Sequence, residues 1–141
     1  MPQPKRFDIQ VGYKCNNDCI FCCVGYRDEN DNLSTNQIKN TLRKAKENKV
    51  KKISFSGGEP TIRKDIVELV NFSKELGFFE VWITTNGKKL SDEKLVEDLV
   101  GAGLTGVLIS VHSCKKKINN NLANKRDNFI NLEKALENLR E

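Results

Sequence analysis

The sequence lacks any apolar run close to the roughly 20 residues that a membrane-spanning helix needs. Its first ten residues, MPQPKRFDIQ, also lack the apolar core of a signal peptide. No short-period repeat or low-complexity tract stands out. With 38% hydrophobic and 30% charged residues, the 141-residue composition is that of an ordinary globular protein. We therefore expect a single cytoplasmic domain over residues 1–141, with no membrane segment.

The sequence also lacks long runs of residues of like charge. The net charge of +5 comes mostly from scattered lysines, which indicate a solvated surface. The one short lysine run, KKK at 115–117, is too small to indicate nucleic-acid binding. It would suit an acidic or peptide partner.

Cysteine, by contrast, is concentrated in one place. Four of the five cysteines lie within nine residues, in the stretch CNNDCIFCC. Disulfides between such close neighbours would close small, strained loops. In a reducing cytosol, clustered cysteines indicate metal binding or catalysis. Cys15, Cys19 and Cys22 would supply three thiolates from one loop.

The spacing of these cysteines leaves two metals open. Soft thiolates suit zinc or an iron–sulfur cluster. A structural zinc site needs four closed ligands, and the fourth would be Cys23, crowded against Cys22, or the distant Cys114 or His112. A cubane cluster on three cysteines instead leaves one iron free for chemistry. The spacing favours the cluster, with Cys23 as a small buried residue and Cys114 as incidental.

Four short β-like runs predict strands, and a helical pattern follows each. The strands are expected at 6–12, 51–57, 79–86 and 106–112, and the helices at about 34–48, 64–76, 91–100 and 128–140. This alternation predicts βαβ units and a parallel sheet, an α/β fold. Ser34 with Gln37 predicts a capping box for the first helix, and Ser91 a cap for the third. The Lys/Asn-rich segment 113–127 is expected to be a flexible loop, serving as a lid or binding segment.

The predicted strands alternate apolar and polar residues, as in Ile53 and Phe55 against Ser54 and Ser56. Buried parallel strands are usually apolar throughout. Since side chains alternate between faces, one face of the sheet would meet the helices and the other would be polar. We expect a partial (β/α) barrel of about four parallel units, curved around a polar cavity. The alternative is one layer of helices on a sheet whose polar face is solvated.

Polar motifs stand at the ends of the predicted strands. SGGEP, TTNG and SVHS follow the second, third and fourth strands, as the cysteine motif follows the first. A Gly-Gly turn or a lone histidine is by itself more often structural. Together, however, these motifs meet at the rim where barrel-like α/β folds place their active sites.

At these motifs the sequence resembles the radical S-adenosylmethionine (SAM) enzymes. CNNDCIFC matches their CxxxCxΦC signature, and GGEP, TTNG and SVHS follow in the family's order, over about residues 7–140. The resemblance implies a 4Fe–4S cluster on Cys15, Cys19 and Cys22, with SAM on the remaining iron. It implies that the residues near SAM are Phe21 beside the adenine, Gly57, Gly58 and Glu59 at the methionyl amino group, Asn86 on the adjoining wall, and Ser110 and His112 near the ribose or carboxylate.

The resemblance also implies a reaction. An external electron donor of the flavodoxin or ferredoxin type would reduce the cluster, SAM would split, and a 5′-deoxyadenosyl radical would abstract hydrogen from a substrate. Such an enzyme would be oxygen-sensitive, and its substrate, a peptide or protein among the options, is not identified by the motifs.

One departure is the number of units. The family usually has six β/α units, whereas four are predicted here, so the chain resembles a truncated or minimal core. Its fourth strand would be an exposed edge, open to another chain or a second copy. The alternative function is therefore a non-catalytic fragment that binds iron–sulfur or zinc.

Overall fold

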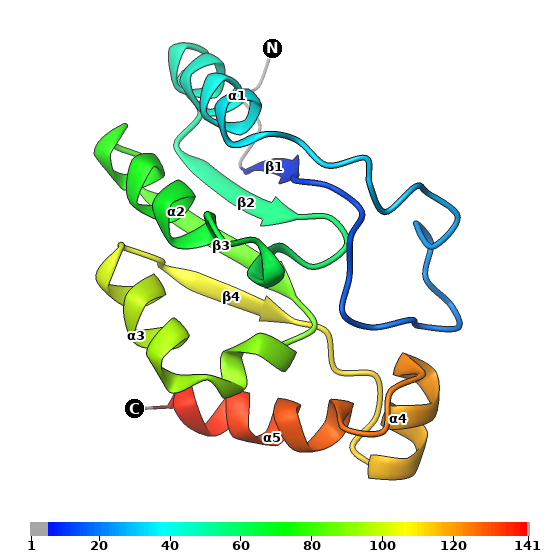
Figure 1. Cartoon of the computed structure of the whole chain (residues 1–141). Helices are drawn as coiled ribbons and strands as arrows, with labels where there is room; N and C mark the ends of the chain where they lie inside the picture. The colour runs from blue at the N-terminus through cyan, green and yellow to red at the C-terminus, as the bar shows by residue number, and fades with distance from the viewer. Residues whose placement is uncertain (1–5, 141) are drawn as a thin grey trace.

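The computed structural model describes residues 6–140, which form a parallel sheet with helices packed on it (Figure 1). In this part of the chain the sheet has four strands in the order β1-β2-β3-β4, and every neighbouring pair is parallel. The strands are β1 (Phe7–Gln10), β2 (Lys52–Ser56), β3 (Glu80–Thr85) and β4 (Gly106–Ile109). The helices are α1 (Thr35–Glu47), α2 (Ile66–Glu75), α3 (Glu93–Gly101), α4 (Lys116–Ala123) and α5 (Asn128–Asn138), with short 3-10 turns η1 (Pro60–Ile62) and η2 (Lys88–Ser91). The predicted α/β class and parallel order are confirmed.

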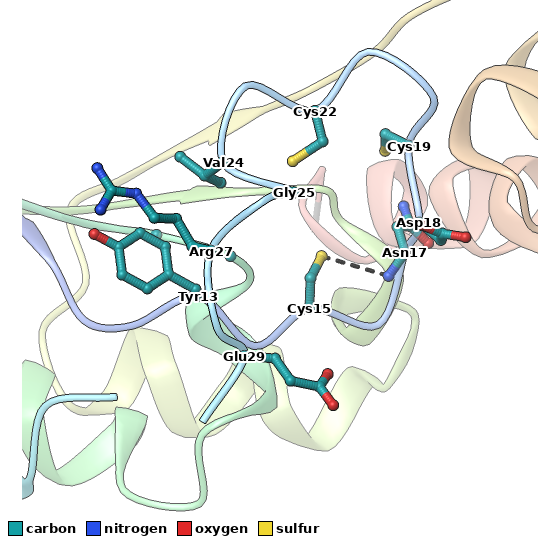
Figure 2. Close-up of a pocket in the computed structure, with 12 residues that line it drawn as sticks. Tyr13, Cys15, Asn17, Asp18, Cys19, Cys22, Val24, Gly25, Arg27 and Glu29 are labelled. Carbon is teal, nitrogen blue, oxygen red and sulfur yellow. Dashed lines mark hydrogen bonds between the residues drawn. The ribbon is translucent and has the colours of Figure 1, made fainter. Parts of the chain in front are cut away.

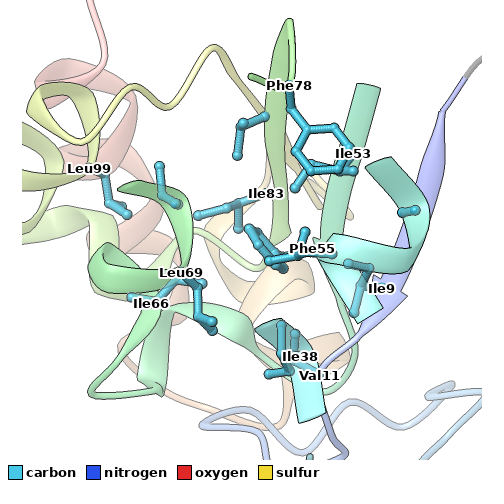
Figure 3. Close-up of a cluster of buried hydrophobic side chains, with 14 of the residues drawn as sticks. Ile9, Val11, Ile38, Ile53, Phe55, Ile66, Leu69, Phe78, Ile83 and Leu99 are labelled. Atoms are coloured by element: carbon cyan, nitrogen blue, oxygen red, sulfur yellow. The ribbon is translucent and has the colours of Figure 1, made fainter. Parts of the chain in front are cut away.

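The core lies between the sheet and the helices (Figure 3). Phe55 and Ile83 are register partners on β2 and β3, and both are buried. They belong to one apolar cluster with Ile38 of α1, Leu69 of α2 and Leu99 of α3. Burying each such side chain stabilises the fold by about 1.5–3 kcal/mol relative to leaving it exposed. This apolar cluster holds the strands against the helices and so fixes the positions of the strand ends.

The other face of the sheet is polar, as the alternation predicted. Asp8 accepts a hydrogen bond from Ser56, and the Ser54 and Thr84 hydroxyls lie 3.5 Å apart. This face is open at both edges, because Asp8 is exposed and Leu108 on β4 is 55% exposed. The described residues thus form the predicted partial barrel of four parallel β/α units, with helices on one face and a polar face that is open to solvent at β1 and β4.

Segment 113–127, expected to be a loop, contains helix α4. Asn119 and Ala123 form its buried face, and Asn124 ends it in the left-handed conformation at φ 50°. The helix lies at the carboxyl ends of the strands, beside α5 (Figure 1). A loop was predicted because asparagine is a poor helix former. The tertiary hydrogen bonds that stabilise the helix at these asparagines are not visible in the sequence.

Helix caps were predicted with mixed success. Ser34 and Gln37 form the expected capping box, with Ser34 Oγ accepting from the Gln37 amide at 3.3 Å and Gln37 Oε1 accepting from the Ser34 amide at 2.8 Å. Ser91 does not cap α3. Its hydroxyl donates to a carbonyl of η2 at 2.8 Å, so it closes that turn and Asp92 precedes the helix. None of the described helices has the length and apolar content needed to cross a bilayer.

Arg63 clamps the two ends of the long loop between β1 and α1. Its Nη1 donates to the carbonyls of Val11, at 3.2 Å, and Leu33, at 2.8 Å. Asp65 holds the guanidinium through two hydrogen bonds of 2.9 and 2.8 Å and also accepts from the Thr35 hydroxyl at 2.7 Å. The cysteine-bearing loop therefore starts and ends at one fixed point.

This clamp predicts an acid-sensitive contribution to stability. Burial raises the pKa of Asp65, but hydrogen bonds from Arg63 and Thr35 and the Arg63 charge outweigh it, and the pKa lies below its ordinary value of 3.8. A carboxyl group with a lowered folded pKa stabilises above its unfolded value, and this stability is lost as the pH falls through the folded value. We expect Asp65→Asn to lower the free energy of unfolding by about 1–3 kcal/mol near neutral pH.

Urea unfolding over a pH series checks this expectation. The difference between wild type and Asp65→Asn should shrink as the pH falls below 3.8. Asp98→Asn is the matched control, because the Lys94–Asp98 pair is exposed and such pairs contribute little. A difference that stays constant across the acid range would contradict the assignment.

Candidate functional site

Three cysteines surround one cavity at the carboxyl ends of the strands. Cys15, Cys19 and Cys22 line this cavity of about 190 Å³, and Figure 2 shows them around the curve of the loop. Cys23 and Cys114 are not among its lining residues, and both are exposed. The prediction of a buried Cys23 is wrong, because the loop makes a tight turn at Cys22–Gly25 on its outer side. The spacing identified the three cysteines that the fold brings together.

Gly57 and Gly58 line the same cavity and hold the base of the loop. The Gly58 amide donates to the Gly12 carbonyl at 2.8 Å, and the Glu59 amide to the Lys14 carbonyl at 2.9 Å. A Cβ added to Gly58 would lie 2.2 Å from the Lys14 carbonyl oxygen, and one on Gly57 2.4 Å from that of Gly12. The Gly-Gly pair is therefore required for backbone to approach backbone next to the cysteines.

The Glu59 carboxylate joins the ends of β2 and β3. It is 2% exposed, and Oε1 accepts from the Thr61 amide at 3.0 Å, the Thr61 hydroxyl at 2.5 Å and the Thr85 hydroxyl at 2.7 Å. Its Oε2 accepts from the Asn86 amide at 2.7 Å. Glu59 therefore positions the two strand ends. Its expected role beside an ammonium group stays a prediction, since Oε2 accepts one hydrogen bond only.

Two of the thiols, those of Cys15 and Cys19, lie in surroundings that disfavour the thiolate. Burial raises the pKa of Cys15 above its ordinary value of 9.0, and nearby Glu59 and Cys22 act in the same direction. Burial and the neighbouring Cys15 and Cys22 likewise raise the pKa of Cys19. Three thiolates gathered here would repel one another, so a bound cationic group is what would offset the cost of ionising them.

Two hydrogen bonds oppose this tendency at Cys15. Its sulfur accepts from the Asn17 backbone amide at 3.4 Å (Figure 2) and from Asn86 Nδ2 at 3.7 Å. Asn86 Nδ2 also donates to Asn16 Oδ1 at 2.7 Å, while Asn86 Oδ1 accepts from the Lys88 amide at 2.9 Å. Asn86, expected on the wall of a SAM site, therefore contacts the cysteine motif itself.

A chain of side-chain amides, which we call the amide ladder, ties the cysteine loop to the helices. Asn17 Nδ2 donates to Asn128 Oδ1 at 2.8 Å, and Asn128 Nδ2 to Asn119 Oδ1 at 2.6 Å. Asn119 Nδ2 in turn donates to the Ser113 carbonyl at 3.1 Å. Asn119 and Asn128 are fully or almost fully buried. The motifs missed these residues, and the run NNN at 119–121 was the one available signal.

The remaining predicted residues lie beside the cysteine cavity. Phe21 and His112 pack edge to face, with ring centroids 4.6 Å apart and planes at 76°. Phe21 is 50% exposed, which leaves ring surface for a planar ligand. Ser110 is half-buried, and its amide donates to the Thr85 carbonyl at 2.9 Å. The fold thus brings SVHS to the cysteine loop without placing Ser110 or His112 in the lining of the cavity.

The donor set fits a cluster better than a single ion. Within residues 6–140, no three His, Cys, Asp or Glu side chains lie close enough to hold one metal ion. A zinc ion would require its ligands within about 2.0–2.3 Å of one point. Three thiols set around a larger cavity suit an iron–sulfur cluster, which offers a different iron to each cysteine.

Known proteins resemble this chain over most of its length. The family model described as "Radical SAM superfamily" matches residues 9–141. A probable GTP 3′,8-cyclase of Methanothermobacter marburgensis is 42% identical over 111 residues, which cover 76% of this chain and 35% of that protein. A probable GTP 3′,8-cyclase of Saccharolobus solfataricus is 37% identical, covering 77% of this chain and 35% of that protein. The chain thus spans about a third of the length of these relatives.

Solved structures agree on the fold. SuiB of Streptococcus suis, solved with S-adenosylmethionine, matches with a TM-score of 0.75 and 30% identity, covering 92% of this chain and 30% of that chain. SuiB has also been solved with its precursor peptide SuiA. BtrN, solved with AdoMet and 2-DOIA, matches with a TM-score of 0.68 at 23% identity, covering 79% of this chain and 47% of that chain, and supports the partial-barrel fold alone.

Proposed function

This chain belongs to the radical SAM superfamily, and on that premise we propose that Cys15, Cys19 and Cys22 hold a 4Fe–4S cluster that works with SAM. When bound, the reduced cluster and SAM supply a 5′-deoxyadenosyl radical that abstracts hydrogen from a substrate. The observation that carries the proposal is the cavity itself, since three cysteines line it and Cys23 and Cys114 do not. Three ligands leave one iron for SAM.

The chain's own residues hold and shape this site. Gly57 and Gly58 fix the base of the cysteine loop and present backbone toward the methionyl amino group. Glu59 joins β2 and β3 and also contributes its carboxylate at the methionyl amino group, since Oε2 accepts a single hydrogen bond within the protein. Phe21 and His112 form the edge near the adenine and ribose, with Ser110 next to them on the chain.

Substrate and partners belong to the same proposal. The relatives are named for GTP, and the SuiB neighbour binds a precursor peptide, yet both resemble this chain. The shared region therefore supports common cofactor chemistry and not one substrate, and a peptide substrate is compatible with it. An external flavodoxin- or ferredoxin-type donor would supply the electron. Strand β4 pairs only with β3 among the described strands, so further strands of another chain, a second copy or a longer polypeptide would complete the sheet.

The competing function is a cluster-binding unit without turnover. The observation that favours it is the length of the match, about a third of each curated relative. Residues that place the substrate, and part of those that hold SAM, would then lie in the other two thirds.

Anaerobic reconstitution separates the two functions. The chain is supplied with iron and sulfide, cluster absorbance is recorded, and SAM and dithionite are added before 5′-deoxyadenosine is measured by mass spectrometry. We expect visible absorbance and product, both lost in Cys19→Ala and both kept in the matched control Cys114→Ala. Absorbance without product would support the non-catalytic unit, and a colourless protein after reconstitution would refute the cluster assignment.

A further inference from the structure

We propose that Asn86 is a positioning residue for the cluster, donating a hydrogen bond to Cys15 and thereby raising the cluster's reduction potential. The inference rests on the proposed function, because it requires a cluster on Cys15. It adds a role for the TTNG motif that differs from lining a SAM pocket.

The orientation of the Asn86 amide is fixed by its neighbours. Its backbone amide donates to Glu59 Oε2 at 2.7 Å, which sets the residue at the end of β3. Its Oδ1 accepts from the Lys88 amide at 2.9 Å, so the other end of the side chain carries the NH₂ group. That group has two hydrogens. One meets Asn16 Oδ1 at 2.7 Å, and the other is directed at the Cys15 sulfur at 3.7 Å.

Cys15 is distinct among the three cysteines. Its sulfur also accepts from the Asn17 backbone amide at 3.4 Å. Among the hydrogen bonds of the described residues, neither Cys19 nor Cys22 receives a side-chain donor at its sulfur. The three sulfurs would therefore differ in hydrogen bonding when they bind the cluster, and Cys15 would accept the most hydrogen bonds.

Donors to a cluster sulfur favour the reduced state. Reduction adds negative charge, which spreads onto the cysteine sulfurs, so a hydrogen bond stabilises the reduced cluster more than the oxidised one. The Asn86 donor sits in a half-buried position, where weaker screening strengthens its effect. Loss of this donor should make the cluster harder to reduce.

A purely structural role for Asn86 makes a different prediction. Asn86 also holds Asn16, the residue after Cys15, and could matter only by shaping the loop. In that case, removing either member of the Asn16–Asn86 pair would disturb the cluster alike. Direct donation predicts an asymmetry, because Asn16→Ala leaves Asn86 Nδ2 beside the Cys15 sulfur.

Redox titration of the reconstituted protein, followed by electron paramagnetic resonance, distinguishes these roles without requiring turnover. In Asn86→Ala, the ratio of reduced to oxidised cluster at a fixed potential should fall about three- to tenfold, where tenfold is ~59 mV for a one-electron couple. In Asn16→Ala this ratio should stay within about twofold of wild type. If Asn86→Ala takes up no cluster, Asn86→Ser gives the same measurement, since its hydroxyl can accept from the Lys88 amide and it adds no charge.

The outcomes are separable. Equal shifts in Asn86→Ala and Asn16→Ala, or no shift in Asn86→Ala, would overturn the inference. So would failure of both Asn86 variants to bind a cluster that Asn16→Ala binds, since Asn86 would then serve the fold. A wild-type chain that binds no cluster would instead refute the proposed function.

Discussion

Gly58→Ala is expected to abolish cluster uptake and to lower the free energy of unfolding by about 3–5 kcal/mol. The new methyl group would lie 2.2 Å from the Lys14 carbonyl oxygen and 2.4 Å from that of Tyr13. Both obstacles are backbone, so no side chain can rotate away. The turn after β2 and the start of the cysteine loop must separate, and the hydrogen bonds from Gly58 to Gly12 and from Glu59 to Lys14 are lost with them.

Urea unfolding of the cluster-free protein and absorbance after reconstitution measure the two effects. Gly101→Ala at the end of α3 is the matched control, because a Cβ there meets nothing within 4 Å. It should be neutral or stabilise by up to about 1 kcal/mol. Normal stability and normal absorbance in Gly58→Ala would show that the close approach is not needed.

Glu59→Gln is expected to destabilise the cluster-free protein by about 3 kcal/mol, although it changes one atom. Each carboxylate oxygen accepts at least one hydrogen bond from a backbone amide, at Thr61 or at Asn86. In glutamine, the NH₂ group replaces one of these two oxygens. In either orientation it would face a backbone N–H whose direction is fixed. The glutamine NH₂ group and one backbone amide would then point at each other, two buried donors without an acceptor. A charge-assisted hydrogen bond would also be lost.

Thermal and urea unfolding without iron, sulfide or SAM test this prediction directly. Glu97→Gln, an exposed substitution on α3, should change stability by less than about 0.5 kcal/mol. A stable Glu59→Gln protein that failed only in SAM binding would show that the carboxylate serves the ligand and not the fold.

The sequence contained enough to find the sheet and the cysteines. Alternating residues such as Ile53, Ser54 and Phe55 report local geometry, because neighbouring side chains on a strand point to opposite faces. The cysteine spacing likewise depends on one short loop. Both features are local, and both correspond to what the structure contains.

What the sequence did not reveal depends on contacts between distant segments. Arg63 closes the cysteine loop through two backbone carbonyls, which leave no trace in residue type. The exposure of Cys23 depends on the path of a turn. The sequence of helix α4 is that of a polar loop, and only the structure shows that Asn119 is buried against Asn128. Such contacts are set by tertiary packing, which overrides local preference.

The amide ladder has a consequence for the order of events when the protein is made. Asn17 and Asn128 are 111 positions apart, so the cysteines leave the ribosome long before their anchor exists. Closing so long a loop costs conformational entropy, and it can happen only after α5 has folded. Under the proposed function, iron and sulfide that arrived before α5 had folded would meet a cysteine loop without this anchor, with four closely spaced thiols open to oxidation.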